Sequence, residues 1–123
     1  MTTFLIADDS DGKRVFLEAL VQKSGIAEEV LTATSTEGAK ELIDSNTVDA
    51  AFIDYEMPSE QGPAVIAYLR EKNPSAKIAM VSSGNSDRYR SDATEAGADA
   101  YVYTSFEEDT VIENLTDLLE EWK

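Results

Sequence analysis

The chain has 123 residues, 42% of them hydrophobic, which is enough for one domain with a single core and too little for two. Its formal net charge of -15 argues against binding to nucleic acids or anionic membranes, whose phosphates such a surface repels. The absence of cysteine excludes disulfides and thiolate metal sites, and the absence of histidine excludes His-based catalysis and His-ligated metals on this chain.

Short apolar runs alternate with longer amphipathic stretches along the chain. The runs FLIA at 4–7 and AAFID at 50–54 have the length and apolar character of strands buried on both faces. The stretches between such runs place apolar residues at helical spacing. In chain order, the predicted elements are a strand at 4–7, a helix at 11–24, a strand at 28–33, a helix at 35–45, a strand at 50–54, a helix beginning at Gly62-Pro63, a strand at 77–83, a helix at 87–96, a strand at 98–103 and a helix at 106–122.

This order repeats a strand followed by a helix. Continuous apolar strands that alternate with helices indicate a parallel sheet covered by helices on both faces. We therefore predict a single α/β domain over residues 1–123, with no output domain. In sheets of this class, sites form where the carboxyl ends of the strands meet at one edge.

Acidic and hydroxyl residues stand at three of these strand ends. Asp8 and Asp9 follow the first strand, Asp54 ends the third, and Ser82 and Ser83 end the fourth. Either acid position alone is more simply explained, as a helix cap or a loop residue, but the combination favours a site of converging carboxylates. Such a cluster is stabilised by a divalent cation, and carboxylates are typical Mg²⁺ ligands. An aspartate beside Mg²⁺ and facing hydroxyl groups can accept a phosphoryl group.

These residues also carry a resemblance to a known family. The chain resembles the response-regulator receiver domain of two-component signalling, in its chemotaxis-regulator-like form, over essentially its whole length. The resemblance implies a flavodoxin-like doubly wound (βα)5 fold with a parallel five-stranded sheet of order 2-1-3-4-5. The features that match in order and spacing are the pair Asp8-Asp9, the run IDYEMP with Asp54 before Met57-Pro58, Gly62, and the runs MVSS and AGADAYVY.

The resemblance implies a phosphoryl acceptor and a metal site. Asp54 would accept the phosphoryl group. Asp9 would bind Mg²⁺ directly, and Asp8 would position the ion or bind it through water. The backbone carbonyl of Glu56 would be a further metal ligand.

The resemblance also implies a switch and partners. Ser82 would bond a phosphoryl oxygen with help from the backbone N–H of Ser83, and Tyr101 would be the aromatic residue that turns inward on activation. The phosphoryl donor would be a phosphohistidine on a histidine kinase or phosphotransfer protein. A downstream protein would bind the face of the fourth helix, fifth strand and fifth helix. Since the N-terminus shows no signal peptide, we expect a cytoplasmic signalling protein without enzymatic activity of its own.

One position departs from the family pattern. Receiver domains carry a Lys-Pro pair after the last strand, and its lysine reaches the phosphoryl group, but this chain has Thr104-Ser105 there. A hydroxyl group neither reaches as far nor offsets a phosphate's charge. The peptide bond between the two residues is expected to be trans, because a non-proline cis bond costs about 3 kcal/mol. Ser105 with Glu108 also fits a capping box for the last helix.

Two functional hypotheses follow from this departure. In the first, Asp54 still accepts phosphate, and Mg²⁺ with a substitute cation supplies the charge. Lys13 and Arg88 are the candidates for that cation, although solvated surface is the favoured interpretation of each. In the second, the chain is a pseudo-receiver that binds partners without phosphorylation because Thr104 replaces the lysine. The complete acid cluster and Ser82 favour the first.

Two hypotheses from other classes are weaker. A haloacid-dehalogenase-type phosphatase places its nucleophile in a D-x-D pattern after the first strand, where this chain has adjacent acids. A flavodoxin-like cofactor binder needs a phosphate-binding loop there, and the run ADDSDGK has acids where the phosphate would lie. Turnover of a small phosphorylated substrate would support the first of these, and a bound flavin the second.

Overall fold

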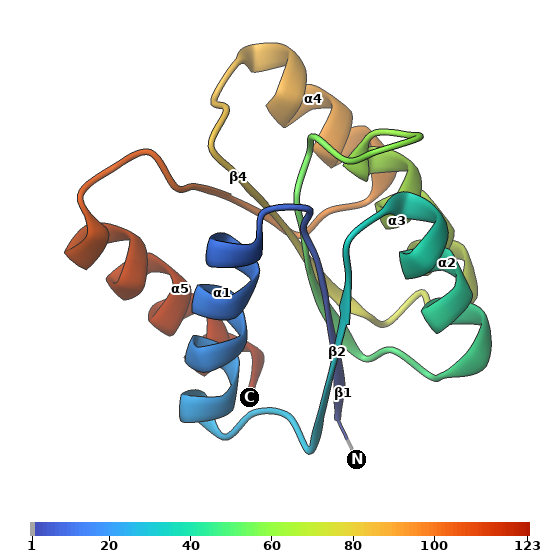
Figure 1. Cartoon of the computed structure of the whole chain (residues 1–123), viewed down its shortest axis with the longest axis horizontal. Coiled ribbons are helices and arrows are strands. Elements are labelled where there is room, and N and C mark those ends of the chain that lie inside the picture. Colours follow the sequence, from blue (N-terminus) through green and yellow to red (C-terminus); the bar gives the residue numbers. More distant parts are fainter. Residues whose placement is uncertain (1) are drawn as a thin grey trace.

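The computed structural model describes residues 2–123, which form a parallel sheet with helices on both faces (Figure 1). The strand order is β2-β1-β3-β4-β5, and every neighbouring pair is parallel, which confirms the predicted doubly wound fold. None of the described helices is long and apolar enough to cross a membrane. In chain order the elements are β1 (Thr3–Ala7), α1 (Asp11–Ser24), β2 (Glu29–Ala33), α2 (Thr36–Ser45), β3 (Ala50–Ile53), α3 (Gly62–Lys72), β4 (Lys77–Ser82), α4 (Asp87–Ala96), β5 (Ala100–Tyr103) and α5 (Glu108–Trp122).

The helices divide between the two faces of the sheet (Figure 1). Helices α1 and α5 cover one face, and α2, α3 and α4 cover the other. Under α1 and α5, Phe4 and Phe52 pack edge to face with ring centroids 4.9 Å apart, and Trp122 lies against Phe52 at 5.8 Å. Burial of a large apolar side chain contributes roughly 1.5–3 kcal/mol, so packing on both faces stabilises the sheet that carries the loops at its carboxyl edge.

The loop between β3 and α3 contains a strained residue. Ser59 has a backbone φ angle of 76°, in the left-handed region that residues with a Cβ rarely adopt. Replacing Ser59 with glycine is expected to raise the free energy of unfolding by about 0.5–1 kcal/mol, since glycine adopts this conformation without the Cβ clash. Urea unfolding measures the change. Ser59→Ala is the matched control because it keeps the Cβ, and a glycine variant less stable than the alanine variant would contradict the prediction.

Candidate functional site

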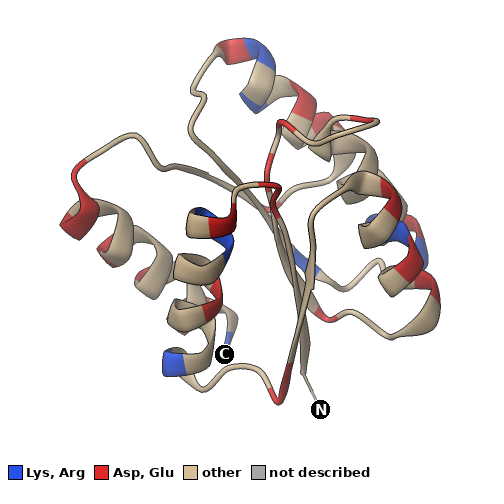
Figure 2. Ribbon diagram, in the orientation of Figure 1, with Lys and Arg blue, Asp and Glu red and all other residues tan. Residues whose placement is uncertain are grey.

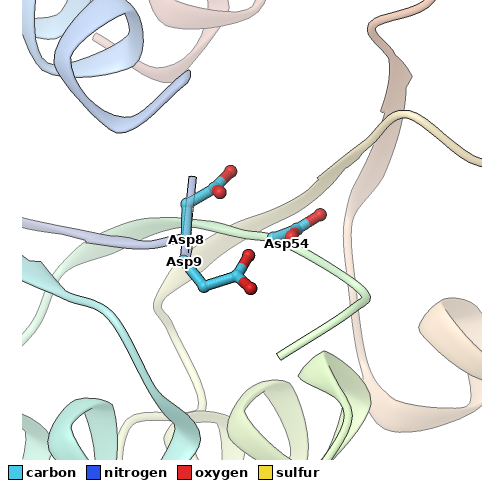
Figure 3. Close-up of side chains that lie close together, drawn as sticks. All are labelled: Asp8, Asp9 and Asp54. Carbon is cyan, nitrogen blue, oxygen red and sulfur yellow. The ribbon is translucent and has the colours of Figure 1, made fainter. Parts of the chain in front are cut away.

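Three aspartates meet at the carboxyl edge of the sheet (Figure 3). Asp8 and Asp9 follow β1, and Asp54 follows β3. The pairing of β1 with β3 sets Ala7 beside Ile53, and the backbone N–H of Asp54 donates to the carbonyl of Ala7 at 2.9 Å. One carboxylate oxygen from each aspartate lies within 4.8 Å of the others. The structure therefore brings together the three carboxylates that the sequence places at strand ends.

The three carboxylates differ in their exposure to solvent. Asp8 is 1% exposed and Asp54 9% exposed, whereas Asp9 faces the solvent. Burial raises the pKa of Asp54 to about 6, the ammonium of Lys13 opposes that rise, and the neighbouring charges of Asp8 and Asp9 add to it. A carboxylate with this pKa is ionised at neutral pH but is destabilised enough there to gain from an added cation.

A lysine lies inside this acidic cluster. The Lys13 Nζ is 3.1 Å from Asp54 Oδ1 and 3.0 Å from Asp8 Oδ2, and it donates a hydrogen bond to the carbonyl of Val81 at 2.6 Å. Its side chain is only 17% exposed, so the interpretation of Lys13 as solvated surface is wrong. Arg88 remains 83% exposed and pairs weakly with Asp92 at 3.7 Å, so the surface interpretation holds for Arg88.

Hydroxyl residues lie at the end of the neighbouring strand. Ser82 ends β4, is 1% exposed, and accepts a hydrogen bond at its Oγ from the backbone N–H of Gly84 at 3.1 Å. The backbone N–H of Thr104 donates to the Ser82 carbonyl at 2.9 Å, which ties the segment after β5 to this strand end. Ser83 is exposed, and its carbonyl accepts a hydrogen bond from Ser105 Oγ at 3.0 Å.

The segment after β5 agrees with one prediction and contradicts another. Within residues 2–123 every peptide bond is trans, as predicted for Thr104-Ser105. The predicted capping box of Ser105 and Glu108 is wrong. Helix α5 begins at Glu108 with Glu107 as its N-cap residue and no side-chain cap, so Ser105 lies two residues before the N-cap position, with its hydroxyl donating to the carbonyl of Ser83.

Aromatic side chains connect the site to α4. Tyr55, the residue after Asp54, stacks on Tyr89 of α4 with ring centroids 3.6 Å apart. The Tyr55 hydroxyl donates to Asp92, and the Tyr89 hydroxyl donates to Glu56, a bond that raises the pKa of Tyr89 to about 12. Sequence reasoning missed this connection, because nothing in the sequence pairs Tyr55 with Tyr89 among the five tyrosines of the chain. The backbone carbonyl of Glu56 as a metal ligand stays a prediction.

Tyr101 is half-buried on β5. Its hydroxyl donates to the carbonyl of Gly84 at 2.6 Å, and the Arg90 guanidinium lies 4.5 Å above its ring centroid. Burial raises the pKa of the Tyr101 hydroxyl. The predicted switch aromatic is therefore bonded to the loop that follows Ser82.

The acidic cluster fits a divalent cation. Asp8 Oδ2 is fully buried, and although the Lys13 Nζ is 3.0 Å away, no donor is aligned with this oxygen for a hydrogen bond. Lys13 forms ion pairs with Asp8 and Asp54 but not with Asp9, so the solvent side of the cluster is open. An exposed carboxylate, that of Asp9, beside two buried ones suits Mg²⁺, which prefers oxygen ligands and keeps several waters when it binds.

Comparison with known proteins places the chain among receiver domains. Residues 4–116 match the family described as the response regulator receiver domain. The chain is 30% identical over 115 residues to the chemotaxis protein CheY of Listeria monocytogenes, covering 94% of this chain and 96% of that protein. It is also 32% identical over 100 residues to a cyclic di-GMP phosphodiesterase of Thermotoga maritima, a match that covers 81% of this chain but 26% of that protein.

Solved structures show the same fold. A CheY-like receiver domain protein from Methanospirillum hungatei superposes with a TM-score of 0.82 at 22% identity, covering 99% of this chain and 96% of that one. The response regulator TrrA from Thermotoga maritima, solved in complex with Mg²⁺ and BeF, has a TM-score of 0.76 at 33% identity. That match covers 96% of this chain and 99% of the other.

Proposed function

The chain belongs to the response regulator receiver domain family of two-component signalling, and from this premise we propose that it accepts a phosphoryl group on Asp54. The donor is a phosphohistidine on a histidine kinase or phosphotransfer protein. The observation that carries the proposal is the setting of Asp54, a nearly buried carboxylate with two other carboxylates and an ammonium group around it.

In the proposed reaction, a carboxylate oxygen of Asp54 attacks the phosphorus atom of the phosphohistidine. The P–O bond forms as the P–N bond breaks, the electron pair of the P–N bond stays on the imidazole nitrogen, and a proton taken up by the ring gives neutral histidine. Since the pKa of Asp54 is about 6, the attacking group is ionised at neutral pH. Bound Mg²⁺ would neutralise charge on the phosphoryl oxygens. The residues that would hold it are Asp8, Asp9, Asp54 and the backbone carbonyl of Glu56.

The remaining site residues serve recognition and output in this proposal. Ser82 would donate its hydroxyl to a phosphoryl oxygen, with the backbone N–H of Ser83 as a second donor. The bond from Tyr101 to the carbonyl of Gly84 supports a coupling between the Ser82 loop and the face of α4, β5 and α5, where a downstream protein would bind. Output by protein binding, without turnover of a small substrate, and a cytoplasmic location complete the proposal.

Intact-mass spectrometry tests the proposed function. Incubation with a small phosphodonor and Mg²⁺ is expected to add the mass of one phosphoryl group to the wild-type protein. Asp54→Asn should show no addition because amide nitrogen and oxygen do not replace the nucleophilic carboxylate. Asp109→Asn, at an exposed position of α5, is the matched control and should behave as the wild type. A wild-type protein that binds Mg²⁺ and takes up no phosphoryl group would contradict the proposal and favour a pseudo-receiver.

A further inference from the structure

Lys13 is a basic residue in a site made of acids, in a chain with 10 basic and 25 acidic residues. Figure 2 shows how the two kinds of charged residue are distributed along the ribbon. Its three oxygen contacts come from three neighbouring strand ends: Asp8 after β1, Asp54 after β3 and Val81 near the end of β4. The ammonium donates hydrogen bonds to Asp54 Oδ1 and to the carbonyl of Val81, and it is held near Asp8 Oδ2 by charge attraction. Its place between the strand ends is therefore defined by contacts from all three strands.

The family's lysine position faces the same space from another element. Thr104, which stands there, and Lys13 both line a pocket of about 370 Å³ between the start of α1 and the start of α5. A lysine at position 104 would extend into this pocket beside Lys13. The shorter Thr104 leaves the pocket open, and the ammonium that contacts Asp54 comes from α1 instead.

We propose that Lys13 takes over the role of the cation that receiver domains carry at the position of Thr104. This proposal rests on the proposed phosphorylation of Asp54, and it assigns two successive contacts to Lys13. The ammonium pairs with Asp54 before transfer and with a phosphoryl oxygen of the phospho-aspartate afterwards. A charge-assisted hydrogen bond to a phosphoryl oxygen strengthens as negative charge accumulates there, so the contact favours the transfer.

The geometry lets Lys13 and a metal ion act together. Lys13 contacts Asp54 Oδ1 and the fully buried Asp8 Oδ2, and it forms no ion pair with the exposed Asp9. A cation bound from the solvent side through Asp9 would leave the ammonium in place. Asp9 would hold the metal ion while Lys13 stays paired with Asp8 and Asp54, so both positive charges would be available to offset the charge of the phosphoryl group.

The first test compares Lys13→Met with Lys23→Met, which removes the same charge from an exposed position at the other end of α1. Phosphorylation by a small phosphodonor in saturating Mg²⁺ is followed by intact mass. We expect Lys13→Met to be slower by about tenfold or more and Lys23→Met to match the wild type. Equal rates for Lys13→Met and the wild type would overturn the proposal.

Two further measurements separate a lost charge from a damaged fold. In Lys13→Met/Thr104→Lys, a lysine approaches from the other side of the pocket and is expected to restore much of the rate, whereas a rate no better than that of Lys13→Met would count against the proposal.

Calorimetric titration of the unphosphorylated proteins with Mg²⁺ needs no phosphotransfer. Removing the ammonium from the cluster is expected to tighten Mg²⁺ binding about fivefold in Lys13→Met alone. If the wild type takes up no phosphate, the proposed function fails, and an unchanged Mg²⁺ affinity in Lys13→Met then overturns the assignment of Lys13 to the site.

Discussion

Replacing Gly62 with alanine is expected to lower the free energy of unfolding by about 3 kcal/mol, because the added methyl group has no room. A Cβ at this first residue of α3 would lie 1.9 Å from the carbonyl oxygen of Asp54 and 2.9 Å from its carbonyl carbon. These are backbone atoms, which cannot rotate away as the end of a flexible side chain can. The backbone N–H of Gly62 also donates to the carbonyl of Tyr55 at 2.7 Å, so relief of the clash would break this bond. Urea unfolding followed by Trp122 fluorescence measures the loss.

Gly12→Ala is the matched control for this prediction. Gly12 lies in α1, and a Cβ there would meet nothing within 4 Å. Alanine is the better helix former, so this variant is expected to gain up to about 1 kcal/mol. Opposite signs for the two variants would assign the loss at Gly62 to its contact with Asp54, and a Gly62→Ala protein as stable as the wild type would contradict the clash.

The central strands were predictable because a strand buried on both faces is a short, continuous run of apolar residues. Phe4, Leu5 and Ile6 are all fully buried, as expected for a central strand covered on both faces. The strand order could not be derived from such runs, since periodicity says nothing about which strands are neighbours. It came from the resemblance, and the structure confirms it. Once the order is known, the meeting of the acids follows from the parallel direction of the strands.

The location of Lys13 could not be predicted from the sequence alone. A lysine in the first turns of a helix usually points into solvent, and its long side chain has many accessible conformations. Only the arrangement of the strand ends shows that three oxygens lie within its reach. The sequence signal was indirect: an acidic cluster without the family's lysine needs a cation, and Lys13 closely follows Asp8 and Asp9.

The start of α5 was mispredicted because a distant contact replaced a local one. Ser105 and Glu108 have the spacing of a capping box, which is a preference between neighbours in the sequence. In the folded chain the Ser105 hydroxyl donates to the carbonyl of Ser83, a residue of the loop after β4. This contact directs the Ser105 side chain toward the loop after β4, and α5 begins at Glu108, later than predicted.

Replacing Asp54 with asparagine is expected to raise the free energy of unfolding at pH 7 in the absence of Mg²⁺, by up to about 3 kcal/mol. Burial raises the pKa of Asp54 from 3.8 to about 6, so the ionised carboxylate is less favourable in the folded protein than in the unfolded chain. Well below pH 3.8, the carboxyl group of Asp54 is protonated in both the folded and the unfolded protein, so it does not affect the free energy of unfolding. As the pH rises to 6, the unfolded chain ionises first, and the wild type loses stability until both states are ionised.

The gain from Asp54→Asn should therefore be full above pH 6 and should shrink as the pH falls toward 4. Urea unfolding at several pH values, followed by Trp122 fluorescence, measures it, and Asp109→Asn at an exposed site is expected to show no comparable change. A gain that is equal at pH 4 and pH 7 would show that ionisation of Asp54 is not its cause. Mg²⁺ should narrow or reverse the difference in stability between Asp54→Asn and the wild type, since an ion bound to ionised Asp54 stabilises only the folded wild type. The buried charge that weakens the free protein is thus the same charge that a metal ion, Lys13 and an incoming phosphoryl group are placed to engage.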